Sequence, residues 1–82
     1  MYDYIIIGGE NCSYCDNSIK LLESKEIEYF HMFMNDLPGS EIAKYEKIAG
    51  GEFRSVPQIF KKDGEDLTYI GGYTELAQSF RS

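Results

Sequence analysis

The sequence predicts an α/β fold with a four-stranded mixed sheet and three helices, in the order β-α-β-α-β-β-α. Three observations lead to this prediction. Short runs of apolar and β-branched residues alternate with segments of helical periodicity, and glycine or proline breakers separate them. The strand, helix and strand expected within residues 2–34 would form a right-handed βαβ unit with parallel strands. An Asp-Gly turn later in the chain predicts an antiparallel hairpin.

The first half of the chain supplies the βαβ unit. Residues 2–7 form an apolar run stopped by two glycines, which is typical of a strand buried on both faces. A helix is expected from Ser13 onward, because apolar residues then recur on one face at helical spacing. Residues 28–34 are mostly apolar on both faces and predict a second strand, which ends at the breaker in residues 35–39. The apolar face of the helix consists of Cys15, Ile19 and Leu22.

The second half supplies a helix, the hairpin and a last helix. Ser40 is the expected N-cap of the first of these helices, and a Gly-Gly pair is its expected end. Its buried stripe would consist of Ile42, Tyr45 and either Ile48 or Ala49. Residues 55–60 and 67–70 are the expected hairpin strands. Thr74 is the expected N-cap of the last helix, and the residues expected to pack it are Leu76, Ala77 and Phe80.

Length and charge limit the functions that the chain can have. Its 82 residues are expected to form one domain, residues 1–82, and the 43% hydrophobic content is that of a folded globular protein. A net charge of −6, with scattered Lys and Arg, leaves no basic field for nucleic acid. No apolar run approaches the ~20 residues needed to span a bilayer, and the first residues lack the features of a secretory signal. We therefore expect a cytoplasmic monomer with neither nucleic acid nor membrane as a partner.

The only two cysteines, Cys12 and Cys15, stand where the first strand leads into the first helix. The unpaired N–H groups and the dipole of a helix N-terminus favour a thiolate, so Cys12 is the predicted nucleophile. Cys15 follows one helical turn later, close enough to attack a mixed disulfide on Cys12 and resolve it. The spacing alone leaves two other interpretations open, namely two small buried hydrophobes or half of a zinc site.

The zinc interpretation is weakened by the shortage of other ligands. A closed structural zinc site takes four ligands, and His31 is the only further histidine or cysteine in the chain. His31 itself lies in an apolar strand, where a core or edge histidine is a simpler interpretation than a ligand or a base. We therefore expect no metal held within one chain.

Three separated motifs together resemble the glutaredoxins, the dithiol family with a thioredoxin-like fold. They are Cys12-Ser13-Tyr14-Cys15 after the first strand, Ser55-Val56-Pro57 before the third strand, and Ile70-Gly71-Gly72-Tyr73 before the last helix. The motifs span nearly the whole chain, and the predicted order of elements agrees with the order in that family. The resemblance implies a glutathione-dependent thiol–disulfide oxidoreductase that reduces protein disulfides and glutathione mixed disulfides.

The resemblance also implies which residues bind glutathione. Val56 would present its backbone N–H and C=O groups to the cysteinyl part, and its bond to Pro57 would be cis. Tyr14 would flank the sulfur, and Arg54 is the nearest basic residue for the glycine carboxylate. The γ-glutamyl carboxylate would lie at the start of the last helix, where N–H groups are unpaired. The residues expected at that end are Gly72, Tyr73 and Thr74.

The chain departs from the usual glutaredoxin pattern at three places. Ser13 replaces the usual proline, Glu10 and Asn11 stand where a basic residue is common, and Thr74 replaces an acidic residue for which Glu75 is the nearest substitute. Some members with serine after the first cysteine share an iron–sulfur cluster between two chains and glutathione. Two alternatives therefore stay open, recharging by thioredoxin reductase and a non-catalytic cluster carrier. Resemblance to small bacterial and phage members suggests ribonucleotide reductase as a protein substrate.

Overall fold

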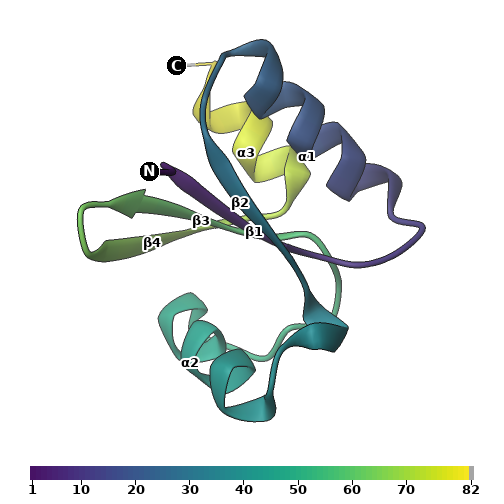
Figure 1. Cartoon of the computed structure of the whole chain (residues 1–82), viewed down its shortest axis with the longest axis vertical. Coiled ribbons are helices and arrows are strands. Elements are labelled where there is room, and N and C mark those ends of the chain that lie inside the picture. Colours follow the sequence, from purple (N-terminus) through teal and green to yellow (C-terminus); the bar gives the residue numbers. More distant parts are fainter. Residues whose placement is uncertain (82) are drawn as a thin grey trace.

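Helices cover both faces of a four-stranded sheet in the computed structural model, which describes residues 1–81 (Figure 1). The predicted order of strands and helices is confirmed, with one short 3₁₀ turn, η1 (Met34–Asp36), added before the second helix. The strands are β1 (Tyr4–Gly8), β2 (Tyr29–Phe33), β3 (Gln58–Asp63) and β4 (Asp66–Gly71). The helices are α1 (Ser13–Ser24), α2 (Gly39–Ala49) and α3 (Tyr73–Ser79).

The sheet is mixed, as predicted, and its strand order is β2-β1-β3-β4. β1 and β2 are parallel, as the βαβ unit requires, whereas β3 is antiparallel to both of its neighbours. α1 and α3 lie side by side on one face, and α2 covers the other (Figure 1). The carboxyl end of β1 therefore leads directly to the start of α1, where the two cysteines lie.

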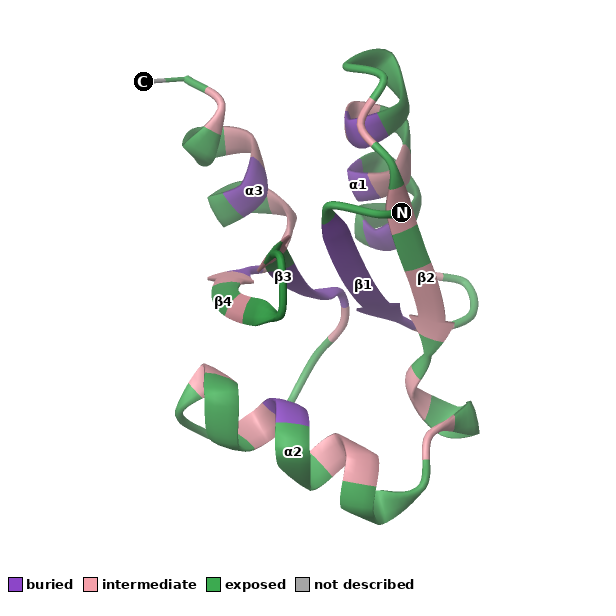
Figure 2. Cartoon of the chain, turned by 60° about the vertical axis from the view of Figure 1, so that its left-hand side comes forward, coloured by how far each residue is buried: buried purple, intermediate pink, exposed green. Residues whose placement is uncertain are grey.

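β1 is the buried centre of the fold (Figure 2). Successive side chains of a strand point to opposite faces of its sheet, so β1 contributes to two cores. The core shared with α1 and α3 consists of Tyr4, Ile6, Leu22, Ile59 and Leu76. The core shared with α2 consists of Ile5, Ile7, Tyr45 and Phe60. Burial on both faces explains why this strand is a continuous apolar run rather than an alternating one.

The ends of several elements differ from the sequence-based expectation. α2 begins at Gly39, with Pro38 rather than Ser40 at its N-cap position. α3 begins at Tyr73 with Gly72 rather than Thr74 at its N-cap position, and the Glu75 side chain accepts the Gly72 N–H. β3 begins at residue 58 rather than 55, since a proline at position 57 has no N–H to give to the ladder.

The expected end of α2 is confirmed, and its expected buried stripe is confirmed in part, because Ile42 is only half-buried. Gly50 follows the last helical residue in the left-handed conformation, with φ of 89°, which glycine adopts without steric cost. Tyr45 is buried, and of the two alternatives for the next position Ala49 faces the core while Ile48 is exposed. None of the helices within residues 1–81 combines the length and the apolar character needed to cross a membrane.

Candidate active site

Cys12 occupies the N-cap position of α1, which confirms the predicted start of this helix. Its backbone is extended, with φ of −114° and ψ of 103°, so its side chain turns back over the first turn. The Cys15 N–H donates a hydrogen bond to the Cys12 Sγ over 3.1 Å. A backbone donor and a helix N-terminus both stabilise negative charge on that sulfur. Ser13 is the first helical residue, as predicted.

Cys12 and Cys15 form a disulfide, so the structure shows the oxidised state of the pair. Their Cα atoms are 5.2 Å apart, within the usual range for such bridges. The two sulfurs differ in access, because Cys12 is half-buried whereas Cys15 is only 2% exposed. A sulfur from another molecule can therefore approach Cys12 but not Cys15, which agrees with the predicted roles of nucleophile and resolving thiol.

The loop before β3 lies beside Cys12. The peptide bond between Val56 and Pro57 is cis, as the resemblance implies. The Val56 carbonyl oxygen lies 3.7 Å from the Cys12 Sγ. Within residues 1–81 no group accepts the Val56 N–H. One backbone donor and one backbone acceptor thus flank the nucleophilic sulfur.

Side chains from β3 and β4 hold this loop in place. The Gln58 Nε2 donates to the Ser55 carbonyl over 2.8 Å, and the Tyr69 hydroxyl donates to the Gln58 Oε1 over 2.6 Å. Burial, followed by the negative charge of Glu75, raises the pKa of Tyr69. Tyr69 therefore keeps its proton and remains a donor at neutral pH. The loop position depends on a buried glutamine that is itself held by a tyrosine.

A groove with a volume of about 270 Å³ brings most of the predicted glutathione residues together. Tyr14 is 60% exposed, and its ring stacks on the ring of Tyr73 with centroids 6.1 Å apart. Arg54 is exposed and does not line the groove, so its proposed contact with the glycine carboxylate stays a prediction. The residues that line the groove are Tyr14, Ser55, Val56, Pro57, Gly72, Tyr73, Thr74 and Glu75.

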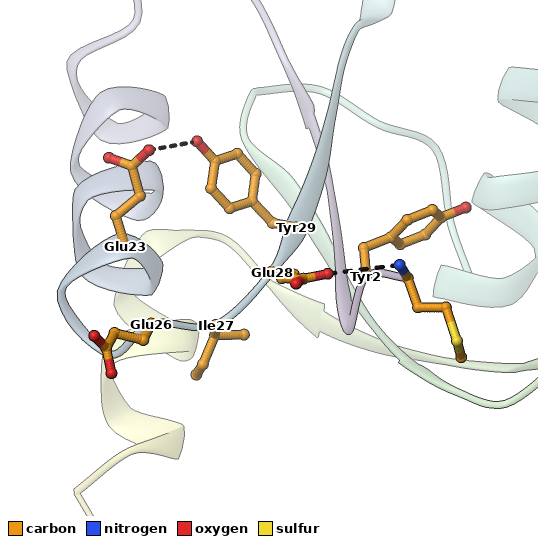
Figure 3. Close-up of a pocket in the computed structure, with 7 residues that line it drawn as sticks. Tyr2, Glu23, Glu26, Ile27, Glu28 and Tyr29 are labelled. Carbon is orange, nitrogen blue, oxygen red and sulfur yellow. Dashed lines mark hydrogen bonds and ion pairs between the residues drawn. The ribbon is translucent and has the colours of Figure 1, made fainter.

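Two other cavities lie outside the groove. One of about 450 Å³ lies on the other side of the Val56 loop, between the end of β1 and η1. Another of about 760 Å³ lies at the opposite end of β1, where α1 leads into β2 (Figure 3). Figure 3 shows Tyr29 donating to Glu23 and the terminal ammonium pairing with Glu28 in this second cavity. It contains no cysteine and lies away from the disulfide, so it does not belong to the active site.

The part of the chain that the structure describes contains no cluster of three or more potential metal ligands. Among residues 1–81, no carboxylate or histidine completes a ligand set with the two sulfurs. The chemistry that these residues support is thiol–disulfide exchange at Cys12.

The structure is similar to solved glutaredoxins over nearly its whole length. Glutaredoxin 1 from Francisella tularensis, crystallised with cacodylate, is 26% identical with a TM-score of 0.70, and the match covers 95% of this chain and 91% of that one. Reduced Escherichia coli glutaredoxin is 29% identical with a TM-score of 0.65, covering 95% and 92% of the two chains. A buckwheat glutaredoxin–glutathione complex has a TM-score of 0.71 at 20% identity, covering 96% of this chain and 68% of that one, which shows a shared fold.

No protein-family model and no curated protein matches the sequence. The functional interpretation therefore depends on the structural comparisons together with the cysteine pair. The mixed sheet and three helices of this chain match the fold of these glutaredoxins, and its disulfide lies at the start of α1. The chain has the thioredoxin-like fold of these solved glutaredoxins together with a redox-active cysteine pair, and it is a thiol–disulfide oxidoreductase.

Proposed function

We propose that the chain uses glutathione to reduce protein disulfides and glutathione mixed disulfides. The observation that carries the proposal is the pair of Val56 backbone groups beside the Cys12 sulfur at the edge of the groove. A cysteinyl residue in extended conformation could pair with both groups, as in an antiparallel bridge, while its sulfur meets Cys12. One structurally similar protein, the buckwheat glutaredoxin, was crystallised with glutathione.

The proposed reaction begins with the Cys12 thiolate. It attacks one sulfur of the substrate disulfide, forms a mixed disulfide and expels the other sulfur as a thiolate, which takes up a proton. In the dithiol route Cys15 then attacks Cys12, releases the substrate thiol and closes the disulfide that the structure shows. Two glutathione molecules reduce this disulfide and leave as glutathione disulfide.

The monothiol route removes glutathione from glutathionylated proteins. Cys12 attacks the glutathione sulfur, the protein thiol leaves, and a second glutathione then attacks the sulfur of the glutathione bound to Cys12. Glutathione disulfide is released and the Cys12 thiolate is restored. Cys15 takes no part in this route, so the two routes separate the roles of the cysteines.

The groove supplies contacts for the rest of glutathione. The stacked rings of Tyr14 and Tyr73 line the groove, and so do Gly72 and Thr74. Glu75 also lines it, and its carboxylate accepts the Gly72 N–H over 2.8 Å. The net charge of −6 favours protein substrates with neutral or basic surfaces around their disulfides.

The test is steady-state turnover with two alternative electron sources. Glutathione with glutathione reductase should sustain reduction of a glutathionylated peptide, whereas thioredoxin reductase alone should not. Tyr73→Ala should raise the KM for glutathione by about 3- to 10-fold, which corresponds to ~1 kcal/mol of lost aromatic contact. Tyr2→Ala removes an exposed aromatic side chain at the amino end of β1 and serves as the matched control. Turnover by thioredoxin reductase, without turnover by glutathione, would contradict the proposal.

A further inference from the structure

His31 and Cys15 approach the same point over Gly8. His31 pairs with Ile6 in the parallel register of β1 and β2, so its side chain lies on the sheet face that α1 covers. A methyl group added to Gly8 would lie 2.6 Å from the His31 Nε2 and 3.2 Å from the Cys15 Sγ. The imidazole nitrogen and the resolving sulfur therefore border the same small space, which is open because Gly8 has no side chain.

The His31 Nε2 is a buried polar atom without a hydrogen-bond partner among residues 1–81. Buried side-chain nitrogens normally have a partner, so an orphaned one calls for an explanation. The ring also packs against Phe33, with centroids 4.8 Å apart, which limits its movement away from the sulfur. In the oxidised state Cys15 has no S–H group to offer, whereas reduction of the disulfide gives it one.

Deprotonation of Cys15 requires a proton acceptor within the fold, whereas deprotonation of Cys12 does not. The Cys12 sulfur accepts the Cys15 N–H and is partly exposed to water. Cys15 is only 2% exposed, and burial disfavours a thiolate without a partner. It must nevertheless lose its proton to attack the mixed disulfide on Cys12. A proton acceptor inside the fold would solve this problem.

We propose that His31 accepts the proton of Cys15 during the resolving step and returns it when the disulfide is reduced. This inference rests on the proposed thiol–disulfide exchange. In the neutral tautomer with its proton on Nδ1, Nε2 has a free lone pair. The Cys15 S–H proton moves to Nε2 while the Cys15 sulfur attacks Cys12, and the substrate sulfur leaves with the electrons of the broken S–S bond. When glutathione later attacks Cys12, Cys15 leaves as a thiolate and the imidazolium returns the proton.

The experiment separates the two cysteine steps in one reaction. The reduced protein is mixed with the aromatic disulfide dithiobis-nitrobenzoate, and release of the coloured thiolate is followed by rapid-mixing absorbance. Cys12 releases one coloured thiolate and retains the other as a mixed disulfide. Cys15 then expels the second. Cys15→Ser, which lacks the second phase, assigns the two phases.

His31→Ala should slow the second phase by about 100-fold, the scale of general acid–base catalysis, and leave the first phase within about 2-fold. Added imidazole should restore much of the second phase, because truncation of the side chain opens space beside Gly8. Tyr29→Phe changes the same face of β2 at the far end of the strand and should leave both phases unchanged.

Three outcomes would overturn the inference. They are an unchanged second phase, equal slowing of both phases, and a slowed second phase that imidazole does not restore. Absence of the first phase from the wild-type protein would instead contradict the assignment of Cys12 as nucleophile, and with it the proposed function. The failure of the two proposals is therefore distinguishable.

Discussion

The two cysteines stand one helical turn apart, but their surroundings are of different kinds. Cys12 is flanked by backbone groups, the N–H of Cys15 and the carbonyl of Val56, and it opens onto a groove. Cys15 is buried, and its sulfur borders the same space over Gly8 as the His31 imidazole. We call Cys12 the open sulfur and Cys15 the closed sulfur. Reactivity at the open sulfur depends on the position of neighbouring backbone groups, whereas reactivity at the closed sulfur depends on the His31 side chain. The same motif therefore contains two sites that mutation should separate.

The largest expected effect comes from Cys12→Ser. This change should reduce both protein-disulfide reduction and deglutathionylation to the uncatalysed rate, because a serine hydroxyl stays protonated and is a poor nucleophile toward sulfur. The measurement is steady-state turnover on a protein disulfide and on a glutathionylated peptide. Appreciable turnover on either substrate would contradict the assignment of Cys12 as the nucleophile and Cys15 as the resolving thiol.

Cys15→Ser should affect the two substrates unequally. Reduction of the protein disulfide should fall by about 100-fold or more, since an intramolecular attack is replaced by a bimolecular attack by glutathione. Deglutathionylation should change by no more than about 3-fold, because the monothiol route uses Cys12 alone. Equal loss on both substrates would remove the distinction between the open and the closed sulfur. The same variant should hold natural substrates on Cys12 as mixed disulfides, which identifies them.

Gly8→Ala tests the close approach of the imidazole and the closed sulfur. The added methyl group would lie within 2.6 Å of His31 and 3.2 Å of Cys15, so we expect a loss of about 2 kcal/mol in the free energy of unfolding. Gly39→Ala is the control, because a methyl group there meets nothing within 4 Å. Urea unfolding of the oxidised protein measures both changes.

A double mutant extends the test of Gly8. Combined with His31→Ala, Gly8→Ala should cost less than it does alone, since the nearest atom is removed. Strictly additive free energies would show that the imidazole does not fill the space over Gly8.

The elements that depend on local patterns could be predicted from the sequence, and those that depend on tertiary contacts could not. β1 and the helix after Cys12 follow from an apolar run and helical spacing, and both are confirmed. The N-cap predicted at Thr74 was wrong, because α3 begins one residue earlier, at Tyr73, where the Glu75 carboxylate accepts the N–H of the N-cap residue Gly72.

Some residues of the candidate site could likewise be predicted from the sequence, and others could not. Val56 and Tyr73 lie in motifs whose order indicates a shared groove, and the structure brings them together. Arg54 is adjacent to the same motif but lies outside the groove, because adjacency does not determine side-chain direction. The approach of His31 to Cys15 had no signal in the residue pattern. It requires the register of β2 on β1, which pairs His31 with Ile6 and so places it beside Gly8.

The smallest expected effect comes from loosening the Val56 loop that lies beside Cys12. Tyr69→Phe removes the donor to the Gln58 Oε1, so we expect a loss of about 1 kcal/mol at neutral pH and a small rise in the KM for glutathione. Because the pKa of Tyr69 is raised, the folded state holds the phenolic proton more tightly than the unfolded chain does. Its contribution is therefore present below the unfolded pKa of about 10 and is lost as pH rises through the higher folded value.

The difference in stability between wild type and Tyr69→Phe should consequently shrink as the pH passes about 10, in urea unfolding at neutral and alkaline pH. Tyr29 and Tyr45 also have raised pKa values, but they titrate in both proteins and cancel in the difference. Tyr2→Phe, which changes an exposed ring, controls for the loss of a hydroxyl. A stability difference that stays constant across this pH range would mean that the Tyr69 proton does not hold the loop, and that the backbone alone positions Val56 beside Cys12.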